Sequence, residues 1–304
     1  MTEEIRKRLK RPRRSMMFLN AQRPGLLKDA YVYRPDTLMI DLEDAVAENQ
    51  KDSARFSLYR ALTTIDYRGV ERVVRINGLD TPHWQEDIRV SVAAGADGIR
   101  IAKCETAADV RTVVEHIEQA EKEFNKEPGV TLVMAALESP KGILNAYEIC
   151  LACPERMIGV AISGGDYRKS MQTRYYPDGL EMLGGRSNML IAARAAGVQC
   201  FDTVFTNVDD MEGFRRETQM VKQMGFDGKS LISPRQIPIT HEIFSPTEKE
   251  IREAEAILIA WQENSAQGIG VFTVNGKMID IAFIPDAERT IELAKASGLY
   301  KGEL

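Results

Sequence analysis

Short apolar runs alternate with amphipathic stretches along most of the chain. Eight of these runs are nearly continuously apolar, which is typical of parallel strands buried on both faces. They span Met16–Asn20, Thr37–Glu43, Arg72–Asn77, Gly98–Lys103, Thr131–Glu138, Arg156–Ser163, Gln199–Thr206 and Lys229–Pro234. Helical stretches fall between most of them, at Leu26–Tyr31, Asn49–Ile65, His83–Ala94, Thr106–Phe124, Pro140–Cys153, Asn188–Ala196 and Asp209–Met224. Eight strands alternating with helices favour a closed (β/α)8, or TIM, barrel over an open doubly wound sheet.

The chain continues beyond the eighth expected strand. Pro246-Thr247-Glu248 opens a long helical stretch, and Gly268–Ile279 predicts two strands around the Asn275-Gly276 turn, a strong hairpin signal. A last helix over Asp286–Ala296 ends just before a glycine, as a C-cap would. The sequence therefore predicts a basic tail over residues 1–12, a barrel over residues 13–245 and a helix–hairpin–helix extension over residues 246–304.

The composition is that of an ordinary globular protein, with 304 residues and a net charge of −5. No apolar run approaches the roughly 20 residues that span a bilayer, and the apolar stretch Ser15–Leu19 is too short for a signal peptide. The cysteines are few and lie mostly in apolar surroundings, so buried thiols are expected. The C-x-x-C pair at Cys150 and Cys153 has no second pair to complete a zinc site. These features predict a cytoplasmic protein without a membrane partner.

Two features of the sequence suggest phosphate or polyanion binding at first sight. A basic run near the N-terminus can bind nucleic acid, but no nucleic-acid-binding motif accompanies it, so a solvated tail is expected. The run comprises Arg6, Lys7, Arg8, Lys10, Arg11, Arg13 and Arg14. The segment Gly225–Ser230 resembles a P-loop, but its glycines are too close together and it precedes a strand. No G-x-G-x-x-G is present either, so a Rossmann cofactor is not expected.

Polar residues gather at the carboxyl ends of the predicted strands, where barrels of this class carry their active sites. Carboxylates and cations are costly to bury there unless they are paired or bind a metal. Five such strand ends on one face favour an active site over separate structural ion pairs. The residues at these five ends are Asp41, Glu43, Asp44, Arg75, Asn77, Lys103, Glu138, Ser163, Gly164, Gly165 and Asp166, and Asp202 lies within the seventh predicted strand.

Glu138 and Asp166 follow neighbouring predicted strands and are expected to share one hard cation. Magnesium suits this pair because it needs few protein carboxylates and keeps open positions for a substrate. Zinc is disfavoured, since the only histidines, His83, His116 and His241, lack ligand spacing.

The other strand-end residues are expected to bind substrate or to surround the metal ligands. Arg75 suits a substrate carboxylate or an enolate oxygen, because a guanidinium donates two parallel hydrogen bonds. The segment Ser163-Gly164-Gly165 has little side-chain bulk, so its backbone N–H groups can approach a carboxylate. The residues expected around these groups are Asp41, Glu43, Asp44 and Lys103.

Eight segments, taken in order, resemble the citrate lyase β-subunit family, within the wider group of citryl-, malyl- and citramalyl-thioester lyases and HpcH/HpaI-type aldolases. They are Arg13–Phe18, Asp41–Val46, Lys51–Arg55, Val74–Asn77, Ala94–Gly98, Ala192–Gly197, Gly225–Ser230 and Gly276–Asp280. The chain departs from the family pattern at Asn20-Ala21, Ile101-Ala102, Ser163–Gly165 and Ile281-Ala282. The changes at Asn20-Ala21 and Ser163–Gly165 are expected to alter the thioester or carboxylate pocket.

The resemblance implies a Mg²⁺-dependent lyase that cleaves a citryl thioester to oxaloacetate and an acetyl thioester. It implies that Arg75 and Glu138 contact substrate, and that Glu138 and Asp166 bind magnesium. It also implies that Asp280 acts as an acid/base residue over a neighbouring subunit's barrel. The implied partners are further copies in a homotrimer, an acyl-carrier subunit and a transferase subunit. Two alternatives stay open: a stand-alone malyl-CoA or citramalyl-CoA lyase, and a non-catalytic assembly or polyanion-binding protein with an idle barrel.

Overall fold

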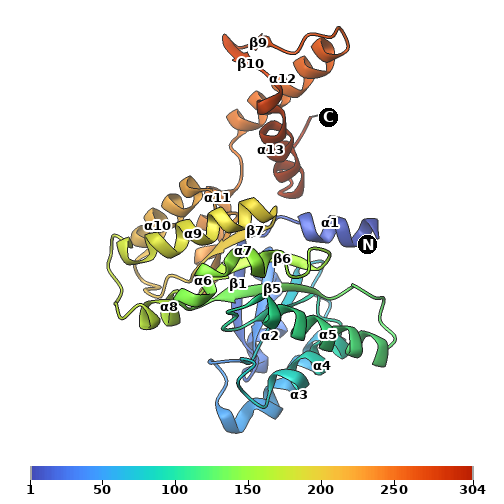
Figure 1. The fold of residues 1–304 in the computed structure, drawn as a ribbon, viewed down its shortest axis with the longest axis vertical. Coiled ribbons are helices and arrows are strands. Elements are labelled where there is room, and N and C mark those ends of the chain that lie inside the picture. Colours follow the sequence, from blue (N-terminus) through green and yellow to red (C-terminus); the bar gives the residue numbers. More distant parts are fainter. Residues whose placement is uncertain (1, 303–304) are drawn as a thin grey trace. The chain divides into compact units, whose positions relative to one another are not determined.

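The computed structural model describes residues 2–302. Eight parallel strands close into one barrel in the order β1 to β8 (Figure 1). Their bounds are Ser15–Asn20 (β1), Thr37–Asp41 (β2), Glu71–Ile76 (β3), Gly98–Ile101 (β4), Leu132–Leu137 (β5), Met157–Ile162 (β6), Gln199–Asp202 (β7) and Gly228–Leu231 (β8). The predicted (β/α)8 barrel is confirmed. Most strands end earlier than expected, because the polar residues at their carboxyl ends leave the sheet and form loops.

Helices alternate with the strands and cover the barrel (Figure 1). They are α2 (Pro24–Lys28), α3 (Lys51–Thr64), α4 (Trp84–Ala94), α5 (Ala107–Glu123), α6 (Pro140–Leu144), α7 (Ala146–Cys150), α8 (Gly164–Ser170), α9 (Leu180–Ala196), α10 (Met211–Met224) and α11 (Gln236–Phe244). Helix α9 begins eight residues before the expected Asn188, because the Gly184-Gly185 pair obscured its helical pattern. Gly185 is required there, since a Cβ would lie 2.6 Å from the Tyr167 ring. No described helix is both long and apolar enough to cross a membrane.

The basic N-terminal segment is not a solvated tail, contrary to expectation. Glu3–Lys10 form helix α1, and Ile5 belongs to the hydrophobic cluster inside the barrel. Arg8 donates hydrogen bonds to the carbonyl oxygens of Asp97 and Val130, at 2.8 and 2.7 Å. These carbonyls precede β4 and β5, so α1 packs at the amino-terminal end of the barrel. Arg8 therefore holds this end together and is not available to a polyanion.

Strands β1 and β8 close the barrel around a buried arginine. Arg13 is fully buried; it donates to both carboxylate oxygens of Glu71, at 2.7 and 2.6 Å, and to Gln199 at 2.7 Å. Gly228 begins β8 where the two backbones approach closely, and a Cβ there would lie 1.9 Å from the Arg13 carbonyl oxygen. Only glycine fits this position, so the entry into β8 accounts for Gly228 in the segment Gly225–Ser230.

The barrel interior is filled by apolar side chains from most of the strands. The buried cluster contains Ile5, Met16, Met39, Val73, Leu132, Met134, Ile158, Ala161 and Phe201. All four cysteines are buried and unpaired, as predicted. Burial raises the pKa values of Cys150 and Cys153 to about 12, so both stay protonated and neither suits redox chemistry.

From Glu242 onward, the described residues form a second compact unit. It contains α12 (Glu248–Ser265), the antiparallel pair β9 (Phe272–Val274) and β10 (Lys277–Ile279), and α13 (Ile284–Ala296). The hairpin turns at Asn275-Gly276, where both residues have positive φ, as the sequence signal requires. Buried apolar residues of α12 and α13 form a small separate core. The predicted helix–hairpin–helix extension is therefore present.

Candidate active site

Two cavities, of about 640 and 420 Å³, lie at the carboxyl ends of the barrel strands, and Asp166 lines both. The larger is lined by residues that include Lys103, Glu138 and Asp166. The smaller is lined by residues that include Asp41, Arg75, Arg100, Ser163, Gly164, Gly165 and Asp166. The structure thus brings together most of the expected strand-end residues. Asp202 is an exception: it lies in a buried cluster with Arg186 and Lys229 and lines neither cavity.

Arg75 is held by two carboxylates. The register of β2 and β3 places Asp41 beside Arg75, and Nε and Nη2 donate to the two Asp41 oxygens at 2.7 Å each. Nη1 lies 3.0 Å from Glu43. Burial lowers the pKa of Arg75, but the charges of Asp41 and Glu43 outweigh burial and raise it. The fork expected to grip a substrate carboxylate is therefore occupied by Asp41, and only the other N–H donors on Nη1 and Nη2 remain for a ligand.

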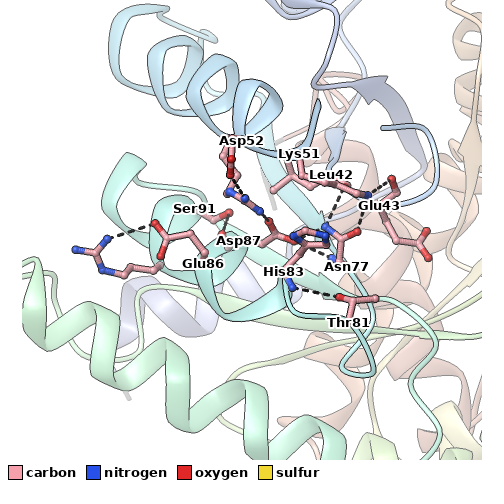
Figure 2. A network of polar contacts seen from close by, with 12 residues as sticks. Leu42, Glu43, Lys51, Asp52, Asn77, Thr81, His83, Glu86, Asp87 and Ser91 are labelled. Atoms are coloured by element: carbon pink, nitrogen blue, oxygen red, sulfur yellow. Dashed lines mark hydrogen bonds and ion pairs between the residues drawn. The ribbon is translucent and has the colours of Figure 1, made fainter. Parts of the chain in front are cut away.

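A buried network fixes the loop that carries Glu43 (Figure 2). Lys51 donates to the carbonyl oxygens of Leu42 and Glu43 at 2.9 and 2.8 Å, and to the Asn77 side chain at 2.6 Å. Asn77 in turn donates to Asp87, also at 2.6 Å. Asn77 is one of the polar strand-end residues, and its side chain supports this loop through Lys51. The network therefore restrains the backbone of Glu43, and through it the position of Arg75.

Lys103 is the second cation that contacts Glu43, besides Arg75. Its ammonium group lies 2.7 Å from Glu43 and 3.4 Å from Asp44. Lys103 also has a φ of +51°, in the left-handed region, two residues after the end of β4. Such a conformation is unfavourable for a residue with a side chain and persists where the surroundings enforce it. The structure therefore gathers Asp41, Glu43, Asp44 and Lys103 into one charged cluster with Arg75.

Glu138 is a buried carboxylate without hydrogen-bond partners. Only 3% of the residue is exposed, and neither carboxylate oxygen accepts a hydrogen bond from any described residue. Burial and the nearby charge of Glu43 raise its pKa to about 7, although Arg75 and Arg100 act in the opposite direction. Neither arginine forms an ion pair with Glu138, and a divalent cation would supply the close positive charge that a buried carboxylate needs.

Asp166 lies in the first turn of α8, immediately after β6. Its carboxylate makes no hydrogen bond or ion pair with another residue in the part of the chain that the structure describes, so its oxygens are free to bind a ligand. The preceding Gly164 donates its N–H to the Thr203 hydroxyl at 2.8 Å. The Gly164 N–H is therefore not free for a substrate carboxylate, contrary to the expectation for this residue. A Cβ at Gly164 would lie 2.9 Å from the same hydroxyl, which explains the glycine.

The side chains present fit a magnesium ion. Glu138 and Asp166 both line the larger cavity and have no protein partner for their carboxylate oxygens among residues 2–302. Magnesium is held by one or two carboxylates, with waters and substrate oxygens as the other ligands. The described residues include no cluster of three or more His, Cys, Asp or Glu that could hold a metal, as a protein-only zinc site would require.

Arg100 is the site residue that the sequence interpretation missed. It lies in β4 beside Arg75, and only 1% of it is exposed. Nη1 and Nη2 donate to the hydroxyls of Ser230 and Ser163, at 3.4 and 3.2 Å, while Nε has no partner. Burial and the charge of Arg75 lower its pKa to about 10. A charged residue inside the apolar run Gly98–Ile101 was the signal that could have found it.

Asp280 belongs to the second unit and follows β10 directly. One of its oxygens accepts a hydrogen bond from the Ala282 N–H at 2.9 Å, which begins a short 3-10 helix. The residues around it expose apolar side chains: Met278 and Ile281 are 66% and 68% exposed. Asp280 thus lies on an apolar surface, a setting suited to contact with another protein surface.

Comparison with protein-family models matches residues 14–234 to the family described as HpcH/HpaI aldolase/citrate lyase. Among curated proteins, the citrate lyase subunit beta of Leuconostoc mesenteroides subsp. cremoris is 50% identical over 293 residues, covering 96% of this chain and 97% of the relative. The (3S)-malyl-CoA thioesterase of Cereibacter sphaeroides is 36% identical over 290 residues, covering 95% of this chain and 97% of the relative.

Among solved structures, the chain is similar to the protein CitE of Mycobacterium tuberculosis, which was crystallised with magnesium, acetoacetate and coenzyme A. The TM-score is 0.74 at 26% sequence identity, and the match covers 94% of this chain and 99% of that chain. The similarity extends beyond the eight strands, since 94% of the chain is more than residues 14–234.

Proposed function

Because this chain belongs to the HpcH/HpaI aldolase/citrate lyase family, we propose that it is a magnesium-dependent carbon–carbon lyase of the citrate lyase beta-subunit type. Its substrate is a citryl thioester, which it cleaves to oxaloacetate and an acetyl thioester. The observation that carries the proposal is Glu138, a buried carboxylate whose two oxygens have no hydrogen-bond partner among the described residues. Identity to a citrate lyase subunit beta over nearly the whole chain supports the choice of substrate.

Glu138 and Asp166 are the residues that would hold the cation. When bound, magnesium supplies positive charge that lowers the pKa of the citryl hydroxyl. A base accepts the hydroxyl proton, the adjacent carbon–carbon bond breaks, and its electron pair passes to the thioester carbonyl. The products of this step are oxaloacetate and the enolate of the acetyl thioester, and no covalent enzyme intermediate is required.

Arg75 would stabilise the enolate oxygen with the N–H donors that Asp41 and Glu43 leave free. Because these two carboxylates fix the guanidinium, it need not reorganise as charge develops on the substrate, which is the basis of oxyanion stabilisation. Asp280 would then return a proton to the enolate carbon. The exposed apolar residues beside Asp280 support its placement over the barrel of a neighbouring copy.

The partners follow from the same family membership. An acyl thioester carried by coenzyme A or by an acyl-carrier subunit is the substrate, and a transferase subunit would load the carrier. A homotrimer would supply the neighbouring copy that Asp280 requires. The free, buried cysteines fit a reducing compartment such as the cytoplasm.

Turnover of citryl-CoA by the purified chain tests the proposal. Oxaloacetate should appear with Mg²⁺ and should not appear with EDTA, and Glu138→Gln serves as the inactive control. The 36% identical (3S)-malyl-CoA thioesterase favours a second candidate substrate, so malyl-CoA and citramalyl-CoA belong in the same assay. Faster cleavage of either would replace the citryl assignment, and no cleavage of any would leave an idle barrel.

A further inference from the structure

Arg100 is a buried cation without a direct ion pair among the described residues. No carboxylate of the described residues forms an ion pair with it, and its contacts are two serine hydroxyls, at 3.4 and 3.2 Å. The Nε atom has no hydrogen-bond partner. An apolar residue of similar size would satisfy the packing of a barrel interior better than a guanidinium that is only partly hydrogen-bonded. A purely structural role therefore does not account for an arginine here.

The nearest carboxylates are already engaged. Asp41 and Glu43 bind Arg75, and Glu43 also binds Lys103. Glu138 is the proposed metal ligand, so its charge is compensated once the cation is present. Arg100 is then the cation of the cluster that has no counterion, and it lines the 420 Å³ cavity beside Ser163 and Asp166.

The Phe18 ring contacts both arginines. The Cζ atom of Arg75 lies 5.1 Å from the ring centroid, and that of Arg100 lies 5.3 Å from it. Both guanidiniums gain a cation–π contact with this ring. Arg75 is fixed by protein carboxylates, whereas Arg100 is positioned only by neutral groups. The two arginines therefore differ in whether their N–H donors are already bound to protein carboxylates. Arg100 is the one whose guanidinium can bind a ligand carboxylate.

The citryl group has a carboxylate that the malyl group lacks. In both, the hydroxyl-bearing carbon carries one carboxylate, which lies next to the hydroxyl. In a citryl thioester that carbon also carries a CH₂–COO⁻ arm, where a malyl thioester has hydrogen. The same arm distinguishes the product oxaloacetate from glyoxylate, and from pyruvate, in which a methyl group stands in its place.

We propose that Arg100 binds the carboxylate of this arm and thereby selects citryl over malyl thioesters. The assignment rests on the proposed lyase function and names the residue that determines its substrate. Nε–H and the remaining N–H donors of Arg100 would form charge-assisted hydrogen bonds with the arm, which are stronger than neutral ones. Ser163 and Ser230 would keep the guanidinium aimed into the cavity when substrate is absent.

Calorimetric titration of the Mg²⁺-saturated full chain with oxaloacetate and with pyruvate measures how much the carboxylate of the arm contributes to binding. Oxaloacetate must be freshly dissolved, because Mg²⁺ promotes its decarboxylation to pyruvate. We expect the wild type to bind oxaloacetate at least about 10-fold more tightly than pyruvate, the scale of one hydrogen-bonded contact to a charged group. Arg100→Met should abolish this preference by weakening oxaloacetate binding, while pyruvate binding changes little. Arg100→Lys keeps the charge without the planar fork and should retain part of the preference.

Equal loss of both ligands in Arg100→Met would overturn the assignment, because a general packing defect would have that effect. Equal affinity of the wild type for the two ligands would overturn it as well, even if Arg100→Met failed to fold. Since the titration uses keto acids, it is independent of turnover. Failure of citryl-CoA cleavage with an intact oxaloacetate preference would reject the proposed lyase reaction and leave Arg100 as a dicarboxylate-binding residue.

Discussion

Replacing Glu138 by Gln should stabilise the metal-free protein while removing its response to magnesium. The carboxylate is buried and neither oxygen has a hydrogen-bond partner among the described residues. Its ionised form therefore opposes folding as long as no metal ion is bound. Glutamine has nearly the same shape without the charge, so the substitution removes the unfavourable charge and leaves the packing in place.

The raised pKa gives the size of the effect. The pKa rises from its ordinary 4.5 to about 7 in the folded chain, and each pKa unit is worth 1.36 kcal/mol, so ionisation costs about 3 kcal/mol at pH 8. For an acid with a raised pKa, stability is present in full below pH 4.5 and is lost as the pH rises towards 7. Metal-free wild type should lose stability over this range, and the loss should be absent in Glu138→Gln.

Urea denaturation in EDTA and in Mg²⁺ measures both effects on the same two proteins. In EDTA at pH 8, the variant should be up to about 3 kcal/mol more stable than the wild type. At a magnesium concentration about 100-fold above the dissociation constant, the wild type should gain about 2.7 kcal/mol and the variant almost nothing. The two unfolding curves should then nearly coincide, although only the wild type cleaves substrate.

Two results would refute this reasoning. A variant that is less stable than the wild type in EDTA would show that Glu138 has a stabilising partner in the folded protein. A variant that gains the same stability from magnesium would show that Glu138 is not a ligand. Far-UV circular dichroism in EDTA would verify that the wild type and the variant have the same fold.

Three further predictions concern other parts of the chain. Arg75→Lys should cost about 2–4 kcal/mol in transition-state stabilisation, measured as kcat/KM, because lysine cannot hold Asp41 with two parallel donors; near-normal turnover would contradict this. Asp202→Asn should lower the free energy of unfolding at pH 7 by about 3 kcal/mol, because Arg186 and Lys229 would remain buried with Glu217 as the carboxylate left to share between them. Despite burial, these two cations lower the Asp202 pKa to about 2, so the difference from the wild type should be complete above pH 4 and should shrink as the pH falls towards 2, as urea denaturation over pH 2–7 would show. Mixing inactive Asp280→Asn and Glu138→Gln proteins should restore part of the activity once subunits exchange, and mixtures that stay inactive despite proven exchange would reject a site shared between copies.

The barrel was predictable because its strands are short apolar runs bounded by polar residues, a pattern set by burial on both faces. The convergence of Glu138, Asp166 and Arg75 followed from the same topology, since parallel strands place their carboxyl ends together. What the pattern could not supply was the pairing of side chains. Asp41 ends β2 and Glu43 follows it, and in the sequence they are independent acids. The register with β3 places Asp41 beside Arg75, and the loop after β2 brings Glu43 to the same guanidinium.

The features that were missed have physical causes. Arg100 lies within a strand rather than at its end, so the pattern of polar strand ends does not reveal it. The basic run before β1 looked like a solvated tail, because the carbonyl oxygens that Arg8 binds are invisible in a residue pattern. Helix α8 begins at Gly164-Gly165, residues that ordinarily disfavour a helix, and its seven residues are too few to show a helical period.

The pairing of β1 with β8 has a consequence for how the protein is made. During synthesis, β1 emerges early and keeps an unpaired edge until the chain has grown beyond Leu231. Exposed strand edges favour association between chains, so the interval before closure is when nascent protein is most prone to aggregate. A larger residue at Gly228, where the backbones nearly touch, should therefore lower the yield of folded protein in the cell, while molecules that do close keep their turnover.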